Sequence, residues 1–209
     1  MRRVPTRTGA VALVVAVGLA LTGCGGGEAM TGEELFDRAL EVNSTFKAAV
    51  GEVQLQVLDD EWVIDQYGDA PRGCGNGYDF RAVRATPEGW RIGSDPTTAA
   101  KKVGEWMGTN GWSDVAVKSF DGDIASAVIT ASRADAYVAS ITVDFNPGKL
   151  MDFVTIYAES TCEPGDFADL MAMLYPGFPT DTIDHEPLPD RERPDATPVF
   201  GFDEDGSLR

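Results

Sequence analysis

The chain has 209 residues, with 34 acidic side chains against 17 basic ones and a formal net charge of −17. So large a negative excess repels nucleic acid, so no nucleic-acid partner is expected. The length suits one domain with flanking segments and is enough to bury a substantial core.

The N-terminal segment has the pattern of a bacterial export signal. Arg2, Arg3 and Arg7 precede the almost wholly apolar run GAVALVVAVGLAL, and no acidic residue occurs before Glu28. The run over 9–21 is shorter than the about 20 apolar residues that a membrane-spanning helix needs, and it is typical of a signal-peptide h-region. The residues after Arg2-Arg3 do not continue a twin-arginine pattern, which favours the general secretory route.

The apolar run ends in Leu21-Thr22-Gly23-Cys24, which resembles the lipobox of bacterial lipoproteins. Small residues before Cys24 let a peptidase approach the backbone, and the thiol can take a diacylglyceryl thioether. We therefore expect 1–23 to be a lipoprotein signal peptide and Cys24 to be lipidated, with an ordinary secretory signal as the alternative. Several acyl chains, at about 0.8 kcal/mol per buried CH₂, would hold the protein on the extracytoplasmic face of the cell membrane.

The mature chain is expected to begin with a short tether. Cleavage removes three arginines and no acidic residue, so the formal charge becomes −20. Residues 24–30 are Gly-rich and reach at most about 25 Å from the lipid. The domain that follows is thus held close to the membrane.

Two cysteines remain after lipidation, Cys74 and Cys162. In an exported protein a disulfide between them is the default, worth roughly 4–5 kcal/mol in the chain-entropy model. Two free thiols or a metal site are the alternatives. A metal site lacks companion ligands because the single histidine, His185, lies in the tail, so we expect neither a metal nor a cofactor.

The first helix is predicted from Thr31 to about Phe46 or a little beyond. Thr31 and Glu34 form a capping-box pattern, and apolar residues recur at helical spacing after them. The alternating stretch 53–57 (VQLQV) then predicts a half-buried strand.

The next part of the chain is read as mostly loop over 59–77, with a possible pairing of 62–64. A strand at 78–86, a Pro-Glu-Gly turn and a short return strand at 90–92 follow. A second helix begins near Asp95-Pro96, with Asp95 or Thr97 as N-cap, and ends at Asn110-Gly111. The side chains expected to point inward from it are Ala99, Val103, Trp106 and Met107.

Four strands are predicted in close succession, over 114–120, 124–132, 136–145 and 150–158. The short turns between them indicate an antiparallel meander with one buried face. A last helical segment covers 166–174. The fold class is therefore α+β: a single domain over 31–178 in which an antiparallel sheet packs against two or three helices.

The tail over 179–209 is acidic and Pro-rich, a composition that does not order itself alone. Its apolar island, Val199-Phe200-Gly201-Phe202, is expected to dock either on the domain or on a partner.

No catalytic set is found. A serine hydrolase needs a base beside its nucleophile, whereas His185 is alone and no Gly-x-Ser-x-Gly occurs. The acidic turns 121–123 and 203–206 do not complete a calcium loop. With so many acids, a glycosidase-like carboxylate pair stays open, but a solvated acidic surface is favoured. We expect a protein that is not an enzyme.

The four tryptophans allow two interpretations. They line a ligand pocket or stack on sugar, or they fill the core, and the core is favoured. These residues are Trp62, Trp90, Trp106 and Trp112.

One layout resembles a known family. A lipobox cysteine and a helix precede a Cys-Gly-rich turn, Cys74-Gly75-Asn76-Gly77, which leads into Tyr78-Asp79-Phe80-Arg81; Gly111-Trp112, the meander and Cys162 follow. This is similar to the LppA-type small lipoproteins of actinobacteria, a family without an assigned activity. The resemblance covers most of 31–162 and implies a Cys74–Cys162 bridge, a cell-envelope role and no catalytic residues.

Two functions are compatible with these features. The first is a tethered, non-catalytic module that binds an envelope protein near the membrane. The alternative is a small-molecule or lipid-binding lipoprotein with an aromatic-lined cavity between the second helix and the sheet.

Overall fold

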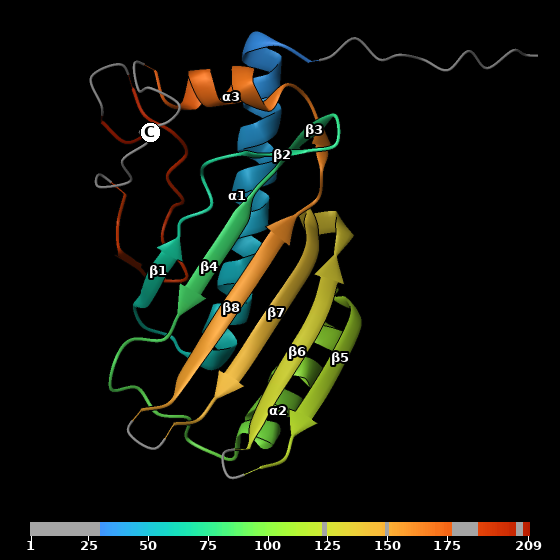
Figure 1. Cartoon of the computed structure of the whole chain (residues 1–209), viewed down its shortest axis with the longest axis vertical. Coiled ribbons are helices and arrows are strands. Elements are labelled where there is room, and N and C mark those ends of the chain that lie inside the picture. The colour runs from blue at the N-terminus through green and yellow to red at the C-terminus, as the bar shows by residue number, and fades with distance from the viewer. Residues whose placement is uncertain (1–29, 123–124, 149–150, 177–187, 204–206) are drawn as a thin grey trace, which may run out of the picture.

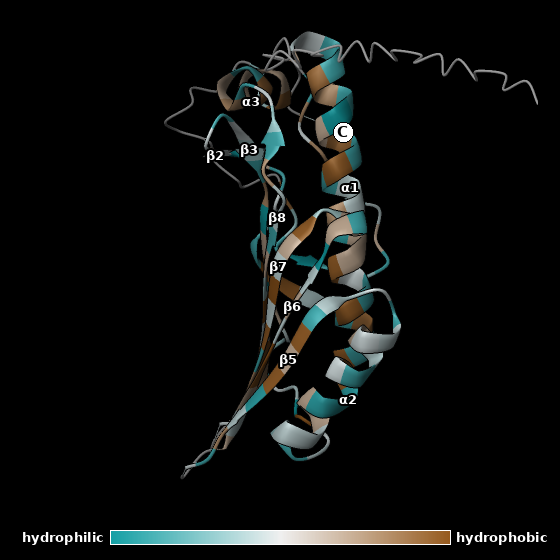
Figure 2. Ribbon diagram, turned by 90° about the vertical axis from the view of Figure 1, so that its right-hand side faces the viewer, coloured by the Kyte–Doolittle hydropathy of each residue, from teal (hydrophilic) through white to brown (hydrophobic). Residues whose placement is uncertain are grey.

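The computed structural model describes residues 30–122, 125–148, 151–176, 188–203 and 207–209. It has two layers: one face of an antiparallel sheet is covered by helices, as the edge-on view of Figure 2 shows. The predicted α+β class is confirmed. The helices are α1 (Gly32–Val57), α2 (Pro96–Thr109) and α3 (Phe167–Leu174), with a 3₁₀ turn, η1 (Ala134–Ala136), between two strands.

The main sheet has seven strands in the order β10-β1-β4-β8-β7-β6-β5 (Figure 1). Consecutive strands of its right half are antiparallel neighbours, so the predicted meander is confirmed. A second, three-stranded sheet has the order β2-β3-β9. The strands are β1 (Trp62–Gln66), β2 (Arg72–Cys74), β3 (Gly77–Asp79), β4 (Arg81–Ala85), β5 (Ser113–Phe120), β6 (Ser126–Arg133), β7 (Val138–Asn146), β8 (Phe153–Ser160), β9 (Glu163–Pro164) and β10 (Arg191–Glu192).

Helix α1 is longer than predicted, and the strand predicted over 53–57 is wrong. The helix continues to Val57, with Val50, Val53 and Gln54 buried at helical spacing after Phe46. A short alternation fits either element, and packing along the sheet decides for the helix. The capping box is also wrong, because the Thr31 side chain makes no capping hydrogen bond.

Helix α2 matches the prediction at both ends. The Asp95 carboxylate accepts from the backbone N–H of Thr98 at 3.0 Å, and Asn110 is the C-cap. The return strand predicted over 90–92 is wrong: the backbone N–H of Ile92 donates to the Asp152 carboxylate instead of to a strand. Of the four predicted inward residues, Val103 and Met107 are buried, while Ala99 and Trp106 are half-buried and pack against the core.

The core lies between the helices and one face of the sheet. The Cys74–Cys162 disulfide is confirmed, with Cα atoms 5.9 Å apart, and it joins β2 to the residues after β8. Trp62 and Trp112 are buried, whereas Trp90 and Trp106 pack against the core from its margin. The largest apolar side chains of the core include Leu35, Phe46, Phe80, Ile129, Ile141, Phe145 and Ile156.

The C-terminal segment 188–203 docks on the domain, which decides between the two alternatives left by the sequence. Strand β10 pairs with β1 at the sheet edge. Phe200 and Phe202 are buried in the core, and the Phe202 N–H donates to the carbonyl of Leu174 at 2.9 Å. We call 188–203 the strap.

Candidate binding site

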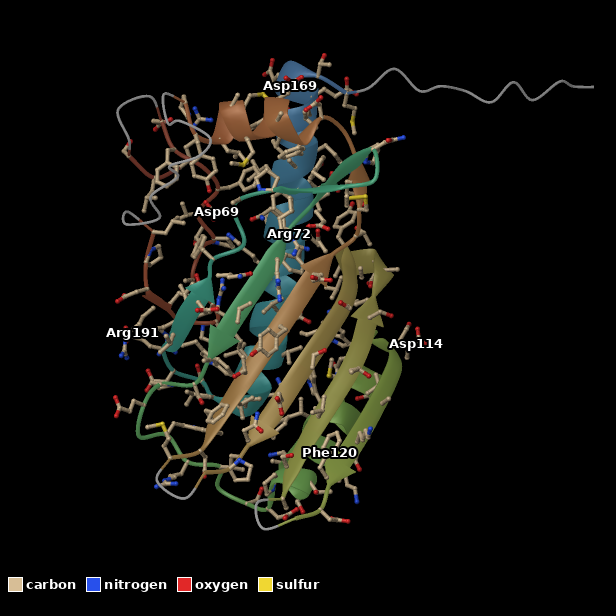
Figure 3. All side chains as sticks on the ribbon, in the orientation of Figure 1. Asp69, Arg72, Asp114, Phe120, Asp169 and Arg191 are labelled. Carbon is tan, nitrogen blue, oxygen red and sulfur yellow. A yellow bond between two sulfur atoms is a disulfide. The ribbon has the colours of Figure 1, made fainter. Side chains whose placement is uncertain are left out.

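The second face of the main sheet carries exposed side chains (Figure 3). Because successive side chains of a strand point to opposite faces, the strand register identifies those that point away from the helices. Six side chains that point to this face lie opposite one another on adjacent strands, and Val83 among them is buried. They form a row without a formal charge: Gln66, Val83, Tyr157, Thr142, Thr130 and Ala116.

A second row runs parallel to the first, and the two rows together with Phe120 and Phe153 are here called the open face. Large aromatic side chains are prominent on it: Tyr157 is 43% exposed, and Phe120 and Phe153 are 42% exposed. Exposed aromatic rings with charges at the margin are typical of protein interfaces. The second row consists of Val63, Ala85, Thr155, Asp144, Val128 and Lys118.

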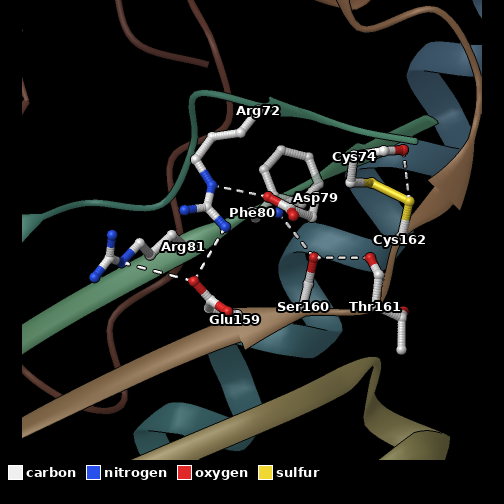
Figure 4. A network of polar contacts seen from close by, with 9 residues as sticks. All are labelled: Arg72, Cys74, Asp79, Phe80, Arg81, Glu159, Ser160, Thr161 and Cys162. Carbon is white, nitrogen blue, oxygen red and sulfur yellow. Dashed lines mark hydrogen bonds and ion pairs between the residues drawn. A yellow bond between two sulfur atoms is a disulfide. The ribbon is translucent and has the colours of Figure 1, made fainter. Parts of the chain in front are cut away.

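A polar network bounds the upper end of the open face (Figure 4). The Arg72 guanidinium lies 2.8 Å from the Asp79 carboxylate and 3.3 Å from that of Glu159. Arg81 is 4.0 Å from Glu159. The network ties β2 to the ends of β4 and β8, next to the disulfide, and so fixes the small sheet relative to the open face.

A cleft of about 390 Å³ adjoins this corner and is here called the first cleft. Gln66 and Arg81 line it and also point to the same side of the sheet as the open face, so the two surfaces are continuous. The rest of its wall is mixed in character. It includes Ile64, Tyr67, Asp69, Arg72 and Leu188.

Arg84 is a buried cation on the helix side of β4. Its guanidinium is 2% exposed and lies 2.7 Å from the Glu192 carboxylate of β10. It also donates to the backbone carbonyls of Gln66 and Tyr67. A buried charge is tolerated when it is paired and fully hydrogen-bonded, so Glu192 makes the strap part of the folded domain.

Lys47 of α1 is a second buried cation beneath the strap and is 7% exposed. Its ammonium lies 3.7 Å from the centre of the Tyr67 ring and donates to the Val199 carbonyl at 3.2 Å. Burial lowers its pKa from 10.5 to about 7. The Tyr67 hydroxyl accepts from the Val199 N–H at 2.8 Å, so both backbone polar groups of Val199 are hydrogen-bonded to the domain.

Asp69 is a buried carboxylate two residues after Tyr67. The Tyr175 hydroxyl donates to it, and burial together with this carboxylate raises the pKa of Tyr175. The contact joins the 67–70 turn to the end of α3, which positions one wall of the first cleft.

A second cleft, of about 240 Å³, lies between α1 and the strap. Lys47, Gln54 and Arg84 form part of its inner wall, and strap residues from Glu192 to Pro198 form the opposite side.

The residues singled out from the sequence are only partly brought together. Cys24 and His185 lie outside the described residues, and none of the four tryptophans lines either cleft. Lys47 and Arg84 are not identified from the sequence. For Arg84 there was a signal, a cation within the apolar stretch Ala82-Val83-Arg84-Ala85; for Lys47 there was none, because lysine is common in helices.

Two further features of the described residues limit the chemistry. No group of three or more His, Cys, Asp or Glu side chains in that part of the chain is placed to hold a metal ion. Nor does any helix described there have the length and apolar character to cross a membrane. No protein-family model, curated protein or solved structure matches the chain.

Proposed function

We propose that the chain is an exported lipoprotein, anchored through Cys24 on the extracytoplasmic face of the membrane, that acts as a non-catalytic binding module of the cell envelope. This proposal rests on the lipobox-like Leu21-Thr22-Gly23-Cys24 and on the resemblance to LppA-type lipoproteins. The partner is a protein of the same envelope.

The open face is the observation that carries the proposal. A sheet covered on one side by helices needs no aromatic side chains on its solvated side, where polar residues are usual. Here Tyr157 stands in a charge-free row across six strands, in a chain of which 24% is charged. Tyrosine is enriched and charge is depleted at the centres of protein interfaces.

The strap is a poorer candidate for capturing the partner. Its apolar island packs Phe200 and Phe202 into the core, so these rings support the domain itself. We therefore assign recognition to the sheet and not to the tail.

Site-specific photo-crosslinking in the native cells tests this assignment. A photoreactive amino acid replaces Thr130 or Thr142 in the lipidated protein, with exposed Lys101 or Lys102 of α2 as control sites. One dominant envelope protein should crosslink from the open face and not from α2. Equal patterns from both surfaces, or none from either, would contradict the proposal.

Anchoring is tested separately by Cys24→Ala. The variant should leave the membrane fraction, whereas the wild-type protein should stay with it and incorporate radiolabelled fatty acid. Membrane retention of Cys24→Ala without acyl label would rule out the lipid anchor.

The first cleft favours a second candidate function, a small-molecule-binding lipoprotein. Its volume of about 390 Å³ falls in the range of ligand pockets, and Tyr67 and Ile64 contribute to its wall. Native mass spectrometry of the protein from its own cells would show a bound molecule in this case, together with no crosslinked partner at the open face.

A further inference from the structure

The carboxylates that border the second cleft are already neutralised. Each lies within ion-pair distance of an arginine. The pairs are Glu52 with Arg133 at 2.6 Å, Glu192 with Arg84 at 2.7 Å and Asp195 with Arg193 at 3.3 Å.

Lys47 is the cation of this cleft that has no carboxylate within ion-pair distance among the described residues. Within the described residues its ammonium makes a cation–π contact with the Tyr67 ring and a hydrogen bond to the Val199 carbonyl. The pKa of Lys47 is lowered because burial of the ammonium and the nearby Arg84 cation outweigh the favourable effect of two carboxylates, Asp69 and Glu192, neither of which is within ion-pair distance.

Gln54 supplies a second unmatched group on the same helix. Its side chain is buried, and its Nε2 has no hydrogen-bond partner in the described part of the chain. A buried amide donor without an acceptor is unfavourable, and a ligand that offers an oxygen atom would satisfy it.

We propose that the second cleft binds a small organic acid, whose carboxylate pairs with Lys47 and whose carbonyl oxygen accepts from Gln54. The site lies beneath the strap, on the helix side of the sheet, and is independent of the open face.

Size and donor number define the ligand class. Lys47 and Gln54 are seven residues apart on α1, a rise of about 10 Å, so the ligand needs two separate acceptors. A volume of about 240 Å³ is below the range of about 300–1,000 Å³ that is usual for drug-sized ligands, so it indicates a small molecule. A carboxylate suits these few donors, whereas a phosphate would leave oxygens unpaired.

N-Acetylglycine is the probe, because it has a carboxylate and an amide carbonyl in a molecule of that size. N-Acetylglycinamide is the matched neutral control. The full-length protein, labelled with ¹³C at the lysine ε-carbons, is titrated with pH at constant ionic strength. The Lys47 resonance should titrate near pH 7 in the free protein, and the acid should raise its pKa by one unit or more, whereas the amide should not.

The acid should accordingly bind at least tenfold more tightly at pH 6 than at pH 9. Lys47→Met should abolish binding, Gln54→Leu should weaken it about tenfold, and exposed Lys101→Met should leave it unchanged. The proposal is overturned if the acid leaves the Lys47 resonance unmoved, if acid and amide bind equally, or if the Lys47→Met protein, shown to be folded by circular dichroism, binds like the wild type. The wild-type titration decides even if that variant does not fold.

Discussion

Lys47 and Gly51 lie on adjacent turns of α1 and seat the strap in different ways. Lys47 binds it through the Val199 carbonyl, at the cost of burying an ammonium group. Gly51 admits it by having no side chain, because the Pro194 carbonyl oxygen occupies the space that a Cβ would take. A hydrogen bond from Lys47 and the missing side chain of Gly51 thus hold the strap on α1.

Lys47→Met should stabilise the protein most at low pH. The pKa of Lys47 is lowered by folding, so the unfolded chain binds the additional proton between about pH 7 and 10.5, and the cost of burying the charge is fully present below pH 7. The advantage of the variant should therefore shrink between pH 6 and pH 10, by on the order of 3 kcal/mol.

Urea unfolding of both proteins at several pH values measures this change, with exposed Lys102→Met as control. An advantage that does not vary with pH would show that Lys47 is not a buried, titrating ammonium.

Gly51→Ala should destabilise the protein by about 2–3 kcal/mol, because the new methyl group overlaps the Pro194 carbonyl and displaces the strap. The matched control is Gly108→Ala in α2, where a Cβ meets nothing within 4 Å; it should be stabilising by up to about 1 kcal/mol. Urea unfolding measures both. If the two variants behave alike, the strap does not rest on α1 at Gly51.

At the scale of elements, β5 and β10 are the two edge strands of the main sheet. Strand β10 is two residues long, whereas β5 has eight residues and exposed side chains along nearly all its length. Two features of β5 oppose pairing with another chain. The register shifts between Ser113 and Ala116, where Asp114 has a positive φ of 54°. In the regular part of the strand, Lys118 carries a positive charge. Bulges and lysines are the usual protection of edge strands against pairing with other chains.

Lys118→Val should therefore promote self-association through β5, because symmetric pairing of Ala116–Phe120 would no longer place two ammonium groups opposite each other. Size-exclusion chromatography with light scattering should show larger species for this variant. Lys102→Val on α2, which adds the same apolar group away from an edge, should remain like the wild type. Equal association of the two variants would mean that β5 is not the exposed edge.

At the scale of the whole molecule, the fold is closed by contacts between distant parts of the chain. The disulfide joins residues 88 positions apart, and β10 returns to β1 from more than a hundred residues away. The disulfide ties the small sheet to the end of β8, while the strap covers α1 and the sheet edge.

Replacing both Cys74 and Cys162 by serine should lower the free energy of unfolding by about 4–5 kcal/mol, because the crosslink limits the conformational freedom of the unfolded chain. The measurement is urea unfolding of the double variant and of the wild type with and without reductant. The reduced wild type should behave like the variant. An unchanged midpoint under reductant would show that the bridge contributes little to stability.

The sequence by itself determined the features that depend on local chemistry. Asp95 and Pro96 start α2, the Asn110-Gly111 pair ends it, and the short turns after each strand specify an antiparallel meander. The disulfide is expected from the sequence because two thiols, Cys74 and Cys162, remain if the chain is exported and lipidated. Such signals work because caps, turns and alternation act over a few residues.

Only the tertiary structure decided the rest. The stretch 53–57 fits a strand or a helix locally, and the length of the buried surface along α1 makes it helical. The apolar island around Phe200 predicts docking but not where it docks. The pairing of Arg84 with Glu192 joins residues far apart in the chain, so only the structure identifies the partner. The open face also depends on the tertiary structure, because its side chains come together only when the register of six strands is fixed. The two clefts likewise form only where segments far apart in the chain pack together.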